Sequence, residues 1–294
     1  MIKLDKKYLL LLCAILFIGT LSARTDMEHL YDRVKRGKKV SVHKIIKSAD
    51  PDLIYSEGLK YYKRSKWKQA GDLFDASLAY FVGNVQEDSI SFFAARCKFK
   101  ERDYSSATIQ LDEFRRKFGR SIFIEDAEAM LAMCYYYLSP DPTRDQTITG
   151  ESIIAFSEFI ERYPNDKRVE TFSKLIVELN ERLKKKAYLN AYTYYKIQRY
   201  KSAIVALRNA LKTYPDTPYR EKILYLITVS CYRVAHDSIP EKQSERYLNV
   251  LDSYYSFINE YPESKHRKEL ERYIKEAKDF LDKNNIKTNN SNGN

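Results

Sequence analysis

The sequence predicts an all-α protein, an α-solenoid of about five helix pairs. One pattern occurs five times, with apolar or small residues in the same columns and an aromatic residue near the end of each copy. The apolar columns follow the 3.6-residue spacing of one helix face. Proline ends the last three copies, because it cannot continue a helix. The copies are Gln69–Val82, Ser106–Gly119, Glu151–Pro164, Ser202–Pro215 and Asn249–Pro262.

A helix-start signal follows every copy. Two residues past the copies stand Asn84, Ser121, Asp166, Thr217 and Ser264, all of them residue types that favour the N-cap of a helix. A glutamate follows the first four of these within a few residues, as is typical of a first helical turn. Each copy is therefore predicted to be the second helix of a pair, and the next pair begins at the cap.

Residues 1–23 are predicted to be an export signal. Lysines at positions 3, 6 and 7 precede an apolar run from Tyr8 to Leu21, and Ser22-Ala23 provides a cleavage site. The run is shorter than the ~20 apolar residues that a spanning helix needs. We therefore expect cleavage rather than a membrane anchor, and an extracytoplasmic mature chain.

Three further segments follow the signal. Residues 24–50 carry eight Arg or Lys against four acidic residues, which predicts a poorly ordered basic leader. This leader either contacts anionic lipid or a partner, or is simply solvated. Residues 51–283 are the repeat solenoid. The low-complexity segment 284–294 is expected to be a disordered tail.

The sequence contains no catalytic or cofactor-binding pattern. Cys97, Cys134 and Cys231 lie far apart in apolar helical stretches, with no disulfide framework and no metal-ligand spacing. The four histidines have no partner at ligand spacing, and no glycine-rich phosphate loop is present. We expect a protein that is not an enzyme and that needs no cofactor or metal. The net charge of +11 could indicate nucleic-acid binding, but export makes nucleic acid an improbable partner.

The repeat resembles the tetratricopeptide repeat, in which small residues and aromatics lie where two helices cross. In the first pair, Gly58, Tyr61, Trp67, Ala70 and Phe74 stand at that family's spacings. The copies are farther apart than the ~34 residues of the standard repeat. This difference predicts extended helices and irregular pairs.

The order of features resembles the BamD family of outer-membrane β-barrel assembly factors, in its Bacteroidota-type form. The resemblance covers residues 44–281 and is carried by Lys44–Ala70, Cys134–Thr149, Ala155–Val169, Tyr214–Glu221 and Tyr254–His266. It implies five tetratricopeptide-like pairs at the periplasmic face of the outer membrane. It also implies a scaffold that binds unfolded barrel precursors and the pore subunit of the assembly machinery. The pore subunit would contact the last pairs, where Tyr247–Tyr261 is rich in tyrosine.

The family is normally lipidated on a cysteine just after the signal. Here Cys13 lies inside the apolar run, after Leu10, Leu11 and Leu12, and no other cysteine precedes Cys97. We therefore expect the mature chain to lack a lipid anchor and to stay at the membrane through its partner and its basic leader.

The tetratricopeptide resemblance also implies a peptide-binding groove, because the first helix of each pair lines the concave surface. The columns that point into it are Tyr55, Leu59, Tyr62 and Lys63 in the first pair, Phe92, Arg96, Phe99 and Lys100 in the second, and Lys185, Tyr188, Tyr192, Tyr195 and Lys196 in the fourth. Aromatic rings supply apolar contact, and Lys or Arg can bind a carboxylate. Barrel precursors commonly end in an aromatic residue with a free carboxylate, which this chemistry would match. The alternative is that half of these aromatics are ordinary packing between repeats.

A second function remains open, that of another periplasmic tetratricopeptide adaptor such as a Tol-Pal-associated division coordinator. A coiled coil before the repeats would favour it, but residues 24–50 show no sustained heptads. A glycan hydrolase is disfavoured, because paired catalytic carboxylates are missing.

Overall fold

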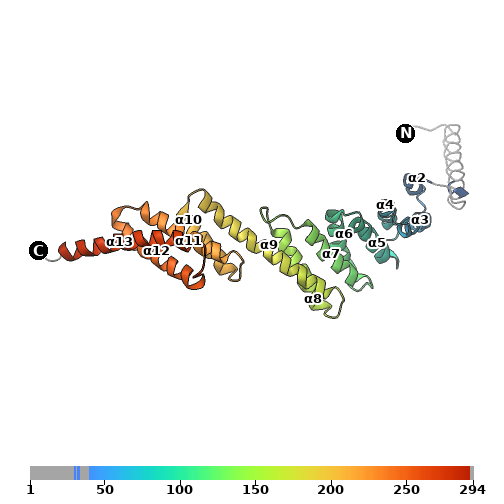
Figure 1. Ribbon diagram of the computed structural model, residues 1–294. Helices are drawn as coiled ribbons and strands as arrows, with labels where there is room; N and C mark the ends of the chain where they lie inside the picture. Colours follow the sequence, from blue (N-terminus) through green and yellow to red (C-terminus); the bar gives the residue numbers. More distant parts are fainter. Residues whose placement is uncertain (1–29, 31, 34–39, 292–294) are drawn as a thin grey trace, which may run out of the picture. The chain divides into compact units, whose positions relative to one another are not determined.

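The computed structural model describes residue 30, residues 32–33 and residues 40–291, and every regular element in them is an α-helix (Figure 1). Contacts divide the chain into two units. Unit 1 contains α2 (Val42–Lys47), α3 (Pro51–Lys63), α4 (Trp67–Leu78), α5 (Glu87–Lys100), α6 (Tyr104–Lys117) and α7 (Ile124–Leu138), with Glu161–Tyr163. Unit 2 contains the rest of α8 (Thr147–Arg162), then α9 (Val169–Lys196), α10 (Tyr200–Thr213), α11 (Arg220–His236), α12 (Pro240–Glu260) and α13 (Arg267–Ser291). The predicted fold class, all-α with tetratricopeptide-like helix pairs, is confirmed.

The five sequence copies form the second helices α4, α6, α8, α10 and α12. Three of these second helices end at the aromatic residue that closes the sequence copy. Phe118, Tyr214 and Tyr261 are the C-cap residues of α6, α10 and α12, with φ values of −120°, −130° and −132°. These residues have left the helical region, so the aromatic and the proline after two of them act together as the stop signal.

The turn that joins the two helices of a pair has the same backbone conformation in three of the pairs. Ser65, Arg102 and Gln198 each adopt a left-handed backbone, with φ of 55°, 64° and 59°. In each turn the next N–H bonds to the carbonyl five residues earlier, as Lys66 N does to Tyr61 O at 3.0 Å. This arrangement satisfies carbonyls that the end of a helix would leave free.

The residues predicted as N-caps shape the turns between pairs. Ser121, Asp166, Thr217 and Ser264 each accept a hydrogen bond from the backbone N–H two residues later, and the helix starts one residue after that. The Ser121 hydroxyl also donates to Asp88 at 2.8 Å, and that of Ser264 to Glu221 at 2.6 Å. These two hydrogen bonds connect the turns at Ser121 and Ser264 to the first helical turns of α5 and α11, in the preceding pairs.

In unit 1, the two helices of the first pair approach each other closely at a glycine. Gly58 of α3 is buried against Phe74 of α4, and a Cβ at Gly58 would lie 3.0 Å from the Phe74 ring. In unit 2, α11 is the central helix. Eleven of its residues are buried, including Ile223, Ile227 and Ala235, because α9, α10, α12 and α13 all pack on it.

Helical backbone extends into both of the flanking segments expected from the sequence. Val40 and Ile45, in the expected leader, are buried against α3 and α4. The backbone of α13 is helical to Ser291, which takes in residues 284–291 of the expected tail. Extending a helix that has already formed adds one hydrogen bond per residue without a new nucleus, which allows a polar run to continue it. The predicted signal, Cys13 and most of residues 24–39 lie outside the described residues.

Replacing Gly58 by Ala tests the close contact of α3 with α4. We expect a net loss of up to about 2 kcal/mol, because overpacking Phe74 outweighs the gain of roughly 1 kcal/mol in helix propensity. The matched control is Gly150→Ala in α8, where a new Cβ meets nothing within 4 Å and should raise stability. Urea unfolding followed by circular dichroism measures both. Equal stabilisation by the two substitutions would contradict the packing described here.

Candidate functional site

The candidate site is one surface of unit 1, which we call the inner face. It is formed by the first helices of the pairs and the start of α6. Its residues are Tyr62, Lys63, Phe93, Arg96, Phe99, Lys100, Tyr104 and Tyr137.

Arg96 lies at the centre of the inner face. It is half-buried on α5, and its guanidinium carbon lies 6.0 Å from the ring centre of Tyr62 on α3. The ring of Tyr62 lies 5.1 Å from that of Phe93 on α5, in an edge-to-face arrangement. The structure therefore brings Tyr62 and Arg96 together from two successive pairs, as predicted.

Phe92 does not line the inner face. Its side chain is 1% exposed and its ring stacks on Phe123 at 4.6 Å, inside the core between α5, α6 and α7. The adjacent residue, Phe93, makes the contact with α3 instead. Tyr55 also belongs to packing, because its ring lies 6.3 Å from Phe74 and 5.8 Å from Phe81 within the first pair. Leu59 packs on the same cluster.

A group of three rings lies one helical turn along α5 from Arg96. Tyr104 and Tyr137 stack with their centres 4.5 Å apart and their planes at 18°. Phe99 lies 5.7 Å from Tyr104 and 6.3 Å from Tyr137. Phe99 was expected here from the sequence. Tyr104 was not, because it lies on the second helix of its pair, and Tyr137 was not, because no groove columns were assigned to the third pair.

The cations of the inner face have no acidic partner. In the described part of the chain, no carboxylate lies within ion-pair distance of Lys63, Arg96 or Lys100. Neighbouring lysines outside this surface are paired, since Lys60 binds Glu57 and Lys98 binds Asp75. The inner face therefore presents unneutralised positive charge beside aromatic rings, an arrangement suited to a carboxylate.

The fourth-pair residues lie in unit 2 and form a stack of rings along α9. Tyr188 lies 5.6 Å from Tyr192 and 4.7 Å from Tyr219, with planes at 12° and 3°, and Tyr192 lies 6.0 Å from Tyr195. All four rings pack on the unit 2 core. Burial raises the pKa of Tyr188 and of Tyr195. Lys185 and Lys196 are exposed at the ends of this stack.

Unit 2 also contains tyrosines whose hydrogen bonds to glutamates were not expected from the sequence. Glu269 of α13 accepts hydrogen bonds from Tyr225 at 2.9 Å and Tyr273 at 3.1 Å, and Glu276 accepts one from Tyr232 at 2.6 Å. Burial, followed by the carboxylate, raises the pKa of Tyr225 and Tyr232. These three hydroxyls are already hydrogen-bonded, so Tyr225, Tyr232 and Tyr273 function as packing.

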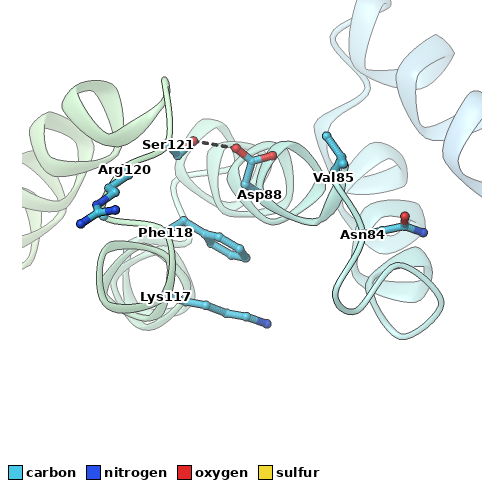
Figure 2. Close-up of a pocket in the computed structure, with 8 residues that line it drawn as sticks. Asn84, Val85, Asp88, Lys117, Phe118, Arg120 and Ser121 are labelled. Atoms are coloured by element: carbon cyan, nitrogen blue, oxygen red, sulfur yellow. Dashed lines mark hydrogen bonds between the residues drawn. The ribbon is translucent and has the colours of Figure 1, made fainter.

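A hollow of about 600 Å³ lies at an edge of unit 1, where the turns after α4 and α6 meet (Figure 2). Its polar groups are largely paired. Asp88 accepts from Ser121, and Lys117 binds the buried carboxylate of Glu87, which also accepts from Gly83 N at 2.9 Å. None of the predicted groove residues lines it.

The described residues show neither a metal cluster nor a reactive thiol. Within them, no three His, Cys, Asp or Glu side chains group to hold a metal ion. Cys97, Cys134 and Cys231 are buried, and burial raises the pKa of Cys97 and of Cys134 to about 12. Across the same described ranges, no helix is both long and apolar enough to cross a bilayer.

The fold defines a tetratricopeptide-like repeat protein. The model of the YfiO family, described as outer membrane lipoprotein, matches residues 47–221 and 184–291. The chain therefore belongs to the YfiO family of outer membrane lipoproteins. The family resemblance seen in the sequence is confirmed.

Curated relatives agree with this assignment. The outer membrane protein assembly factor BamD of Rickettsia prowazekii (strain Madrid E) is 26% identical over 199 residues, which cover 67% of this chain and 77% of the relative. The putative outer membrane protein assembly factor BamD of Aquifex aeolicus (strain VF5) is 23% identical over 173 residues, or 58% of this chain and 56% of the relative. The match thus spans about half of the Aquifex protein.

Solved structures with some likeness include two tetratricopeptide proteins. The TPR2AB domain of yeast Sti1 covers 78% of this chain and 98% of its own, at 14% identity and a TM-score of 0.35. The TPR domain of P58(IPK) covers 82% of this chain and 68% of its own, at 16% identity and a TM-score of 0.39. Superposition is poor at these scores, and the fold class rests on the helix pairs described above.

Glu87 gives unit 1 a pH-dependent stability. Hydrogen bonds from Lys117 and from Gly83 N hold the pKa of its carboxyl below the ordinary value of about 4.3. A depressed pKa adds stability that is present above the unfolded-state value and is lost as the pH falls through the folded-state value. The melting temperature of Glu87→Gln should therefore lie below that of the wild type at neutral pH, and the gap should close in acid.

The matched control is Glu170→Gln, in the first turn of α9, where the side chain is exposed and pairs with the exposed Lys174. This substitution should change the melting temperature at neutral pH less than Glu87→Gln does. A gap between wild type and Glu87→Gln that is constant from neutral to acidic pH would contradict the role given to Glu87.

Proposed function

We propose that this chain is a non-catalytic adaptor of outer-membrane β-barrel assembly. In this proposal it acts at the periplasmic face and binds two kinds of partner. Unfolded barrel precursors bind the inner face of unit 1, and the pore subunit of the assembly machinery binds helices of unit 2. Contact of the basic leader with the outer-membrane surface belongs to the same proposal. Membership of the YfiO family and the names of the relatives support it over the Tol-Pal type of adaptor.

One observation carries the precursor site: Arg96 lies over the Tyr62 ring of the inner face and the buried Phe92 ring, with no carboxylate of the described residues at ion-pair distance. A precursor tail that ends in an aromatic residue would place its terminal ring near Tyr62 and Phe93. Its terminal carboxylate would then meet Arg96, with Lys63 and Lys100 close by on the same surface. A charge-assisted hydrogen bond of this kind contributes about 1.5–3 kcal/mol, which is roughly a tenfold to hundredfold change in affinity.

Arg96→Glu tests the precursor site, because it reverses the charge and leaves the core intact. Titration of a fluorescent barrel-tail peptide should show binding at least about tenfold weaker than to the wild type. The matched control is Arg120→Glu, an exposed arginine of unit 1 that lies outside the inner face, and it should bind as the wild type does. Melting curves for all three proteins check folding. Equal affinity of Arg96→Glu and wild type would contradict the site.

We propose the exposed face of α12 as the site that binds the pore subunit. Tyr247 and Tyr254 are 3% and 9% exposed and fill the core, so most of the tyrosine-rich segment is packing. Leu248 and Tyr255 are 52% and 45% exposed and lie seven residues apart, which places them on one face of α12. An exposed leucine and tyrosine on one face favour a protein partner.

The double substitution Leu248→Ser and Tyr255→Ser should abolish co-purification with the pore subunit from outer membranes. Deleting residues 237–294 is a poorer test, because it would uncover the buried side of α11. The control is Ile109→Ser in unit 1, an equally exposed aliphatic residue on α6. Recovery of the pore subunit by the double variant at the wild-type level would rule out this face.

A further inference from the structure

We propose that a small hollow of unit 2, between α10, α11 and α12, binds a doubly charged phosphate group. The hollow has a volume of about 130 Å³, and its lining residues are Ile204, Arg208, Cys231, Val234, Arg246 and Asn249. Pockets that enclose drug-sized molecules measure roughly 300–1,000 Å³, so this hollow suits a single small group. The proposed function makes no use of it.

The first argument is the charge of α10. This helix carries Lys201, Arg208 and Lys212 and contains no acidic residue, whereas each of the other second helices, α4, α6, α8 and α12, contains at least two. The side chain of Arg208 is exposed, and no carboxylate of the described residues lies within ion-pair distance of it. Folding therefore leaves the positive charge of Arg208 without compensation at the hollow.

The second argument is that another arginine is held at the same hollow. Arg246 of α12 is half-buried and donates a hydrogen bond to the hydroxyl of Ser238, in the turn between α11 and α12. That hydroxyl donates in turn to the carbonyl oxygen of Val234 on α11. These bonds restrict the Arg246 side chain and use one of its five N–H donors. Among the described residues, Arg246 also has no carboxylate at ion-pair distance.

The third argument is the composition of the lining. None of its six residues is acidic. The larger hollow between α12 and α13 differs in this respect, because Glu276 and Asp279 line it together with its cations. The charges of the smaller hollow are thus available to a ligand.

One side of the hollow is apolar. Ile204, Val234 and the buried Cys231 form it, and charges attract more strongly where apolar groups displace water. Burial raises the pKa of the Cys231 thiol, while the positive charge of Arg208 acts in the opposite direction. The charge of Arg208 is therefore felt at this apolar side.

The number of charges selects the ligand. Two guanidinium groups that line one hollow repel each other, and a doubly charged ligand offsets both of them. A phosphomonoester carries about −1.5 to −2 at pH 7 and has three strong acceptor oxygens, and arginine binds phosphate through two parallel N–H···O bonds. A carboxylate of a protein partner carries one charge and would neutralise only one arginine. The arrangement favours phosphate, whether free in solution or as the headgroup of a phosphomonoester lipid.

Calorimetric titration of the full chain with inorganic phosphate, at neutral pH and constant ionic strength, tests the site. Arg208→Gln and Arg246→Gln should each weaken binding at least about tenfold, because each removes charge-assisted hydrogen bonds. The matched control is Lys201→Gln, which removes the same charge from an exposed position of α10 outside the hollow, and it should bind as the wild type does. Melting curves check folding, and Arg208→Gln, at an exposed position, keeps the test valid if Arg246→Gln unfolds.

Flotation with phosphatidylcholine vesicles, with and without phosphatidic acid, identifies the source of the phosphate. Flotation that requires phosphatidic acid and is lost in Arg208→Gln would assign the site to a lipid headgroup. Calorimetric binding of inorganic phosphate without such flotation would assign it to free phosphate. Either result supports the site.

Three results would overturn the proposal. The first is a wild type that binds neither inorganic phosphate nor, through Arg208, the phosphatidic acid vesicles. The second is an equal loss in Lys201→Gln and Arg208→Gln, which would indicate diffuse surface charge. The third is acetate bound as tightly as phosphate, which would indicate an acidic protein segment as the ligand. None of these results bears on the precursor site of unit 1.

Discussion

Unit 1 depends on the packing of α5 against two neighbouring pairs. Adjacent rings on this helix have different environments, because Phe92 is buried and stacked on Phe123 before α7, whereas Phe93 lies between Phe123 and Tyr62 of α3. This division fixes the rotation of α5 about its axis. As a consequence, Arg96 and Phe99 face the same side as Tyr62 rather than the core. The inner face therefore exists because two phenylalanines anchor the helix that carries it.

The two units use aromatic residues in different ways. In unit 2, tyrosine rings stack on one another and the hydroxyls of Tyr225, Tyr232 and Tyr273 bond to glutamates of α13. These three hydroxyls are therefore satisfied within the unit, while Lys185 and Lys196 are exposed at the ends of the ring stack. In unit 1, Arg96 lies over the rings of Tyr62 and Phe92, and no carboxylate of the described residues lies within ion-pair distance of it. Binding capacity depends on the charges that folding leaves unpaired, and the number of aromatic residues does not predict it.

Much of the fold could be read from the sequence, but the site could be read only in part. The apolar columns predicted α4, α6, α8, α10 and α12, because a 3.6-residue period and a helix stop are properties of a local segment. The choice between Phe92 and Phe93 was wrong, because both lie within one helical turn and only the contact with α3 decides which ring faces it. Tyr254 and Tyr255 differ in burial for the same reason. Tyr137 was missed because its place beside Phe99 depends on the packing of three helices.

The central claim is that an unfolded precursor binds the inner face of unit 1. Photo-cross-linking tests it most directly, with a benzophenone amino acid placed at Lys100 on the inner face or at Ile109 on α6. Both positions are exposed, so neither substitution should disturb the core. The account predicts that a barrel precursor cross-links at position 100, that a free tail peptide competes with it, and that position 109 stays unlabelled. Cross-links at position 109 alone, or equal labelling at both positions, would contradict it.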